Sequence, residues 1–233
     1  MRRAKTHIMA NDLEKEAAAR ASLKFVKDGN VVGLGTGSTA AFFIKLLAEE
    51  VKNGLRVRGI PTSVRSREMA LSVGIPLTTL DDCQEIDVTV DGADEVDPKL
   101  RLIKGGGGAL LREKIVASAT KQLVIVADAS KQVPVLGKFP LPVEVIRFAQ
   151  PLVAKRIAAL GARVEVRAGA GGTPFVSDEN NHILDCHFEQ IPDADGLARE
   201  LSEMPGVVEH GLFIGLASVI LVARGSEIIE LRR

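Results

Sequence analysis

Residues 86–119 constrain the fold of this chain more than any other stretch. A β-branched run, 86–90, ends at a turn that carries Asp91 and Asp94, and the four glycines 105–108 then precede an apolar-patterned helix. In open α/β sheets, ligands bind beyond the carboxyl ends of the strands, beside the unpaired N–H groups of helix N-termini. We therefore expect this stretch to present an active site.

The rest of the first half alternates strands with helices. Asn11 or Asp12 is a candidate cap for a helix that runs to about Lys27. Further helices are expected over about 40–51, from after the run 61–63 to about 73, and over 109–119. Strands are expected over 30–34, 58–60, 75–80, 86–90 and 123–127. Strands that alternate with helices predict a Rossmann-like, mainly parallel sheet in an α/β fold.

A second, smaller domain is predicted after a proline-containing connector at 137–142. Its expected order is βαββαβ, typical of a ferredoxin-like α+β domain, with strands at 143–146, 163–167, 174–176 and 182–187 and helices at 150–160 and 193–204. The runs 206–213 and 218–223 are expected to return the chain to the first sheet. The predicted domains are therefore 1–137 with 209–233, and 138–208.

Composition excludes several classes of protein. Lys and Arg number 30 and Asp and Glu number 30, so no basic field favours nucleic acid or an anionic membrane. With no Trp or Tyr, the chain offers few platforms for stacking bases. Two cysteines suit a reducing cytoplasm, and we expect neither a secretory signal nor a membrane helix.

A second candidate site is the loop Thr36, Gly37, Ser38 and Thr39, which follows a strand and opens a helix. Amides and hydroxyls at such a place suit a phosphate. The run 35–40 also fits the dinucleotide pattern G-x-G-x-x-G/A, but the expected acid about 20 residues later is absent. An NADP site that uses Arg58 and a plain tight turn stay open as alternatives.

The acidic turn does not have the pattern of a metal site. An EF-hand needs oxygen ligands at its third and fifth positions and Glu at its twelfth, where this chain has Ala93, Glu95 and Leu102. The four histidines show no zinc-type spacing with the cysteines. A solvated turn is the alternative to a ligand site for Asp91 and Asp94.

The glycine run and its helix supply further candidates. Glycines allow close backbone approach to a ligand, and we expect their amides to be free to stabilise an oxyanion. Glu113 shares a helix face with Ala109, Leu110, Val116 and Ala117, so its carboxylate should be desolvated and basic enough for a general base. The alternative is a Glu held by the helix dipole and paired with Lys or Arg.

The motifs GLGTGSTA, TVDGADEVDP, LIKGGGGALLREKIVA, VADASK and LGKFPLPVEV together resemble the type A ribose-5-phosphate isomerase family over nearly the whole chain. The resemblance implies an aldose–ketose isomerase of the non-oxidative pentose phosphate pathway. Such an enzyme interconverts ribose 5-phosphate and ribulose 5-phosphate through an enediolate without metal or cofactor. Glu113 would be the base, with Asp91, Asp94 and Lys104 as the other catalytic residues.

The resemblance also implies a substrate site and an assembly. The substrate residues would be Lys15 near the phosphate, Thr36, Gly37, Ser38, Thr39, Asp91, Gly92, Ala93, Asp94, Lys104, Gly105, Gly106, Gly107 and Lys131. For Lys15, a solvated surface charge is the alternative. We expect a cytoplasmic homodimer or homotetramer. A deaminase or CoA-transferase-like enzyme and a sugar-phosphate-binding regulator are the alternative functions; a deaminase would be expected to bring a catalytic His, and a regulator a DNA-binding segment.

Overall fold

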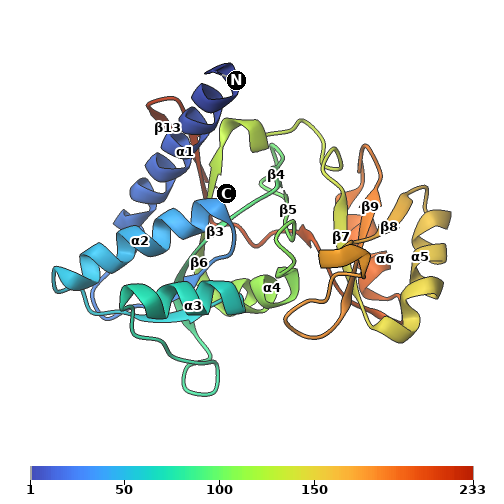
Figure 1. Ribbon diagram of the computed structural model, residues 1–233, viewed down its shortest axis with the longest axis horizontal. Helices are drawn as coiled ribbons and strands as arrows, with labels where there is room; N and C mark the ends of the chain where they lie inside the picture. Colours follow the sequence, from blue (N-terminus) through green and yellow to red (C-terminus); the bar gives the residue numbers. More distant parts are fainter. Residues whose placement is uncertain (1, 233) are drawn as a thin grey trace. The chain divides into compact units, whose positions relative to one another are not determined.

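The computed structural model describes residues 2–232, and its contacts divide the chain into two compact units (Figure 1). The first unit comprises Met1–Ala93, Ile115–Lys131 and Leu216–Arg233, and the second comprises Asp94–Lys114 and Gln132–Gly215. The helix α4 (Leu110–Ser118) contributes residues to both. Within the described residues, no helix is long and apolar enough to cross a membrane.

A six-stranded sheet forms the centre of the first unit, in the order β13-β12-β6-β3-β1-β2. Five neighbouring strands run parallel, and β13 pairs antiparallel with β12 at one edge. Their bounds are β1 (Val31–Leu34), β2 (Arg58–Pro61), β3 (Ile86–Gly92), β6 (Thr120–Asp128), β12 (Val219–Arg224) and β13 (Glu227–Arg232). The predicted parallel sheet is confirmed.

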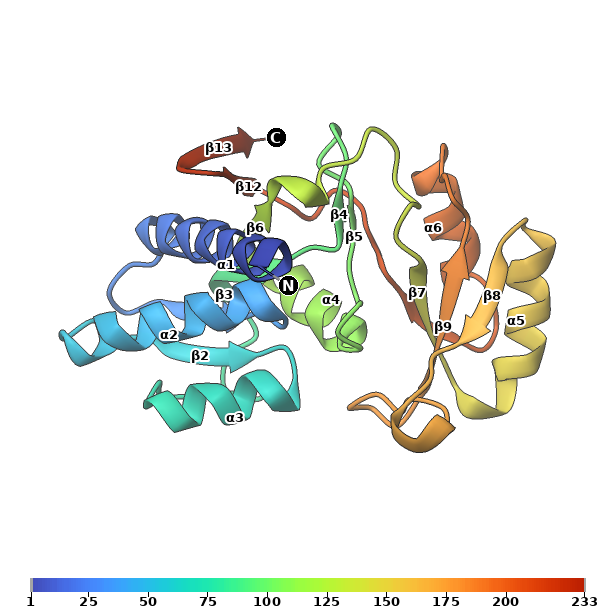
Figure 2. The same cartoon turned by 45° about the horizontal axis from the view of Figure 1, so that its top comes forward.

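Three helices accompany this sheet: α1 (Arg2–Ser22), α2 (Ser38–Lys52) and α3 (Val64–Val73). Helices α1 and α2 lie side by side in both views of the fold (Figure 2), and α1 also contacts β6 and β12. Their apolar faces bury Ala18, Phe43 and Leu47 against strand residues such as Val90 and Val124. The helical spacing read from the sequence thus marks the faces that cover the sheet.

Three details of the first unit differ from expectation. The helix predicted to begin at Asn11 or Asp12 begins at Arg2, because residues 2–11 contain no glycine or proline to stop it. The predicted strand 75–80 reduces to one parallel bridge between Gly59 and Leu77. The Pro76 carbonyl accepts a hydrogen bond from the Gly59 amide. Because Pro76 has no N–H to donate, it cannot extend the ladder further. The final strand β13 was not predicted.

The second unit contains a four-stranded antiparallel sheet in the order β10-β7-β9-β8. With two helices, its elements follow one another as βαββαβ, and the order of strands is fourth, first, third, second. The elements are β7 (Leu141–Val145), α5 (Gln150–Ala159), β8 (Arg163–Val166), β9 (His182–His187), α6 (Ala194–Ser202) and β10 (Val207–His210). The predicted ferredoxin-like arrangement is therefore present.

A small sheet, β11-β5-β4, also belongs to the second unit. It consists of β4 (Glu95–Val96), β5 (Leu102–Ile103) and β11 (Leu212–Phe213). Apolar residues of α5, α6 and the sheet share one core with Ile103 and Leu212. Short 3-10 turns complete the fold at Leu23–Phe25, Ala129–Lys131, Arg147–Ala149 and Ala170–Gly172.

Two expectations fail in the second unit. The run 206–213 does not return to the first sheet, because β10 pairs with β7 and β11 with β5. The predicted strand 174–176 makes only isolated bridges at Pro174 and Val176. By their contacts, residues 94–114 group with the second unit, where β5 pairs with β11.

Candidate active site

Asp91 is the second-to-last residue of strand β3 and does not follow the strand as expected. Its side chain is buried. Its Oδ1 accepts hydrogen bonds from the amides of Thr36, at 3.0 Å, and of Gly92, at 2.7 Å. A Cβ at Gly35 would come within 2.3 Å of the same oxygen, so only glycine allows this approach. The phosphate-type loop and the first aspartate are thus held together within the first unit.

The loop itself is positioned by a chain of hydroxyl groups that sequence analysis did not single out. Thr36 Oγ1 donates to Ser63 Oγ at 2.8 Å, Ser63 to Ser66 Oγ at 2.9 Å, and Ser66 to the Gly35 carbonyl at 2.7 Å. Thr62 Oγ1 lies 2.7 Å from Thr36 Oγ1. The clue available in the sequence was their place, directly after strand β2 and at the start of α3, which Ser63 caps.

The other predicted phosphate-binding residues of this loop are Gly37, Ser38 and Thr39. Gly37 and Ser38 are exposed, Thr39 is buried, and Gly37 has a φ of 114° that favours glycine. Because α2 begins at Ser38, its first amides have no partners inside the helix. These features suit an anion at the helix N-terminus.

Two predicted lysines also belong to the first unit. Lys131 is half-buried at the end of the 3-10 turn that follows β6. Lys15 is on α1, with 18% of its side chain exposed and its Nζ 3.5 Å from Asp12 Oδ1. Lys15 is thus more covered than a solvated surface charge.

In the second unit, Lys104 and Glu113 form a buried ion pair. Lys104 Nζ lies 3.4 Å from Glu113 Oε1, and 5.5 Å from the centre of the Phe213 ring. The Lys104 amide donates to the Gly211 carbonyl at 2.9 Å, which ties the residue to the segment before β11. The burial of Glu113 predicted from its helical neighbours is confirmed, and so is the alternative that it pairs with a lysine.

Asp94 is held by the glycine run. Its Oδ2 accepts from the Gly106 amide at 2.8 Å, and its own amide donates to Ile103 at 2.8 Å. The Gly108 amide donates to the Gly105 carbonyl at 3.0 Å. The expectation that the glycine amides are free is therefore wrong for Gly106 and Gly108, because both are used to shape the loop.

The residue after Glu113, Lys114, is half-buried among polar groups. It donates to Glu209 Oε1 at 2.7 Å and lies 4.9 Å from the centre of the Phe213 ring, on which Lys104 also packs. Burial lowers the pKa of Lys114, and Glu209 acts in the opposite direction. Burial and the Lys114 ammonium lower the pKa of nearby His210 to about 4.

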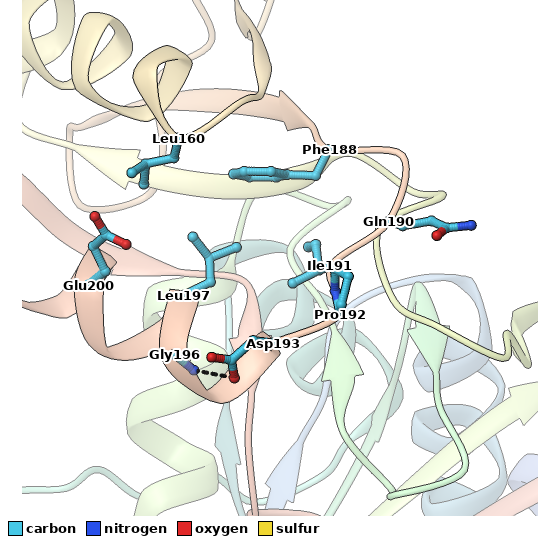
Figure 3. A pocket seen from close by; sticks show the side chains of 9 residues that line it. All are labelled: Leu160, Phe188, Gln190, Ile191, Pro192, Asp193, Gly196, Leu197 and Glu200. Carbon is cyan, nitrogen blue, oxygen red and sulfur yellow. Dashed lines mark hydrogen bonds between the residues drawn. The ribbon is translucent and has the colours of Figure 1, made fainter.

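A separate hollow lies in the second unit, where Leu160, Phe188 and Leu197 meet (Figure 3). Its floor includes the start of α6, where Asp193 Oδ1 accepts from the Gly196 amide at 2.9 Å. None of the predicted site residues lines it. Within residues 2–232, no three His, Cys, Asp or Glu side chains are grouped so that they could hold a metal ion.

The family model for "Ribose 5-phosphate isomerase A (phosphoriboisomerase A)" matches residues 58–227 of this chain. The chain belongs to the ribose-5-phosphate isomerase A family. It is 53% identical over 230 residues to the ribose-5-phosphate isomerase A of Parvibaculum lavamentivorans, a match that covers 95% of this chain and 100% of that protein. The family predicted from the motifs is thus confirmed.

Solved structures of the family agree with the fold. The ribose-5-phosphate isomerase A of Methanocaldococcus jannaschii is 41% identical, with a TM-score of 0.92, and the match covers 96% of this chain and 100% of that one. A D-ribose-5-phosphate isomerase in complex with phospho-erythronic acid is also 41% identical, with a TM-score of 0.92, covering 94% and 98%. The α/β fold with its second, smaller antiparallel sheet is therefore that of the family.

Proposed function

We propose that this chain interconverts D-ribose 5-phosphate and D-ribulose 5-phosphate through an enediolate, with Glu113 as the base. The observation that carries the proposal is the buried pair of Glu113 and Lys104, 3.4 Å apart, in a chain of this isomerase family. The reaction belongs to the non-oxidative branch of the pentose phosphate pathway.

The chemistry requires a proton to move between two adjacent carbons and another between their oxygens. In the proposal, Glu113 takes the proton from one carbon and returns it to the next. A buried carboxylate suits this step because it is poorly hydrated and keeps its position. The Lys104 ammonium stabilises the negative charge that develops on the enediolate oxygen.

The two aspartates handle the hydroxyl groups and the opening of the sugar ring. Asp94 is fixed by the Gly106 amide, and Asp91 by the amides of Thr36 and Gly92. A hydrogen-bonded carboxylate keeps its orientation, which lowers the entropic cost of aligning it with a substrate hydroxyl. Gly107 and Ala93 complete the backbone surface around the sugar.

The phosphate is assigned to the loop Thr36, Gly37, Ser38 and Thr39, with Lys15 and Lys131 as cationic partners. What supports this is the N-terminus of α2, which offers unpaired amides at that loop. The chain has no acidic residue about 20 positions after this loop, where a dinucleotide site needs one to bind the ribose hydroxyls. No cofactor or metal takes part in the proposed reaction.

The enzyme is further proposed to be a cytoplasmic homodimer or homotetramer.

A coupled assay for ribulose 5-phosphate formed from ribose 5-phosphate tests the proposal. The protein should be produced in a host that lacks its own isomerase, with Glu113→Gln purified in parallel as the control. Turnover by the natural chain well above the control is the expected result. No turnover, together with a rise in Tm on adding ribose 5-phosphate, would instead support the sugar-phosphate-binding regulator.

A further inference from the structure

Arg167, the residue directly after β8, bonds to the glycine run, although 62 positions separate it from Gly105. Its Nη1 donates to the Gly105 carbonyl at 2.8 Å and to the Gly106 carbonyl at 3.3 Å. All three residues belong to the second unit. A guanidinium that bonds two successive carbonyls fixes the direction of two successive peptide groups.

A trans peptide group is planar, and its C=O and N–H point in opposite directions. The peptide whose carbonyl belongs to Gly105 carries the amide of Gly106, and that amide donates to Asp94 Oδ2 at 2.8 Å. Arg167 therefore holds one side of this peptide and Asp94 the other. By the same geometry, the Gly107 amide points away from Arg167.

Arg167 is itself held firmly. Its Nε donates to Asp185 Oδ2 at 3.0 Å, its Nη2 bonds Asp185 Oδ1, and its guanidinium lies 5.9 Å from the centre of the Phe175 ring. Only 14% of its side chain is exposed. Phe175 in turn packs against Gly108, where an added Cβ would come within 2.5 Å of the ring.

We propose that Arg167 is a positioning residue: through the Gly105–Gly106 peptide it fixes Asp94 and aims the Gly107 amide at the substrate. This rests on the proposed function, in which Asp94 and the glycine run contact the sugar. Lysine cannot replace arginine here, because one ammonium cannot hold Asp185 at two points and two carbonyls at once. The forked guanidinium is what the geometry requires.

The first measurement needs no substrate. In the free protein, amide hydrogen exchange and the NMR shift of Gly106 should change in Arg167→Lys, because its peptide loses the bond to Nη1. The matched control is Arg163→Lys, at the start of the strand that Arg167 follows, since Arg163 pairs with exposed Glu165. We call the contacts of Arg167 and Asp94 with the Gly105–Gly106 peptide the clamp. Unchanged hydrogen exchange and an unchanged NMR shift of the Gly106 amide in Arg167→Lys would show that the clamp does not exist.

The second measurement is kinetic. Arg167→Lys should lower kcat between about 10-fold and 100-fold with a smaller change in KM, because misplaced groups lose alignment. In an Asp94→Asn background, the same substitution should cost much less, because the residue it positions is already disabled. Arg163→Lys should be as active as the natural chain, and circular dichroism should confirm that every variant is folded.

Two kinetic results would overturn the role in catalysis. One is a kcat of Arg167→Lys equal to that of the natural chain. The other is an equal fold-loss of kcat when Arg167→Lys is made in the natural chain and in the Asp94→Asn variant. If the natural chain itself had no isomerase activity, the proposed function and this role in it would both fall. The Gly106 amide measurement would still decide whether the clamp exists.

Discussion

Lys104 Nζ lies 3.4 Å from Glu113 Oε1, and their side chains are 3% and 4% exposed. Removing two charges from water costs several kcal/mol per ion, and each partner makes the burial of the other tolerable. The pair therefore keeps a carboxylate and an ammonium side by side in poorly hydrated surroundings. In the proposed reaction, one moves a proton and the other stabilises the resulting charge.

Replacing Lys104 by Met should destabilise the protein by about 3–5 kcal/mol, because it leaves Glu113 buried without this cation. Urea unfolding followed by circular dichroism measures the loss. Adding Glu113→Gln to Lys104→Met should restore part of the stability, because the uncompensated charge is gone. Strict additivity of the two single losses would contradict the idea of a coupled pair.

Replacing Gly35 by Ala should abolish the binding of a phosphosugar, because the new Cβ would come within 2.3 Å of Asp91 Oδ1 and 2.6 Å of its Cα. Ribose 5-phosphate should raise the Tm of the natural chain but not that of Gly35→Ala. NADP, the control ligand, should raise neither Tm. Protection of the natural chain by NADP would favour a dinucleotide site.

Stability should fall on acidification because of His210. Its pKa is lowered from 6.5 to about 4 in the folded protein, mainly by burial, so the unfolded chain binds a proton first. This contribution is fully present above pH 6.5 and is lost as the pH falls towards 4, by about 3 kcal/mol in total. Lys114 disfavours the charged ring, and Glu209 partly offsets it.

The check on His210 is a comparison of the natural chain with His210→Gln by urea unfolding between pH 4 and pH 7. The variant should lose less stability over this range, because it has no ring to protonate. Identical slopes would show that His210 does not control acid stability. A steeper fall of the unfolding free energy with decreasing pH in the variant would contradict the lowered pKa of His210.

The sequence predicted the parts of this site whose signal is local. The burial of Glu113 follows from neighbours three and four positions away, and the loop at Thr36 follows from a strand that turns into a helix. The same logic applied after β2 would have found Thr62 and Ser63. The parallel sheet and the ferredoxin-like order also followed from local periodicity and the order of elements.

Other features depend on contacts between distant positions, which no local pattern encodes. Arg167 reads as an ordinary strand-end arginine until the fold brings it to Gly105. Residues 206–213 were predicted to join the first sheet, but pairing with β7 and β5 determines their place. The hydrogen bond from the Gly106 amide to Asp94 also could not be predicted, because it depends on how the turn between them folds.

The exchange of solvent deuterium into C2 of ribose 5-phosphate, in the natural chain and in Glu113→Gln, tests the central claim most directly. Glutamine keeps the size of the side chain but removes the basic oxygen, so exchange and kcat should fall by about 10²–10⁴-fold, with little change in KM. Glu50→Gln, the same substitution at an exposed position, should exchange at the natural rate. Natural exchange and turnover in a folded Glu113→Gln would contradict the account and move the role of base to another carboxylate.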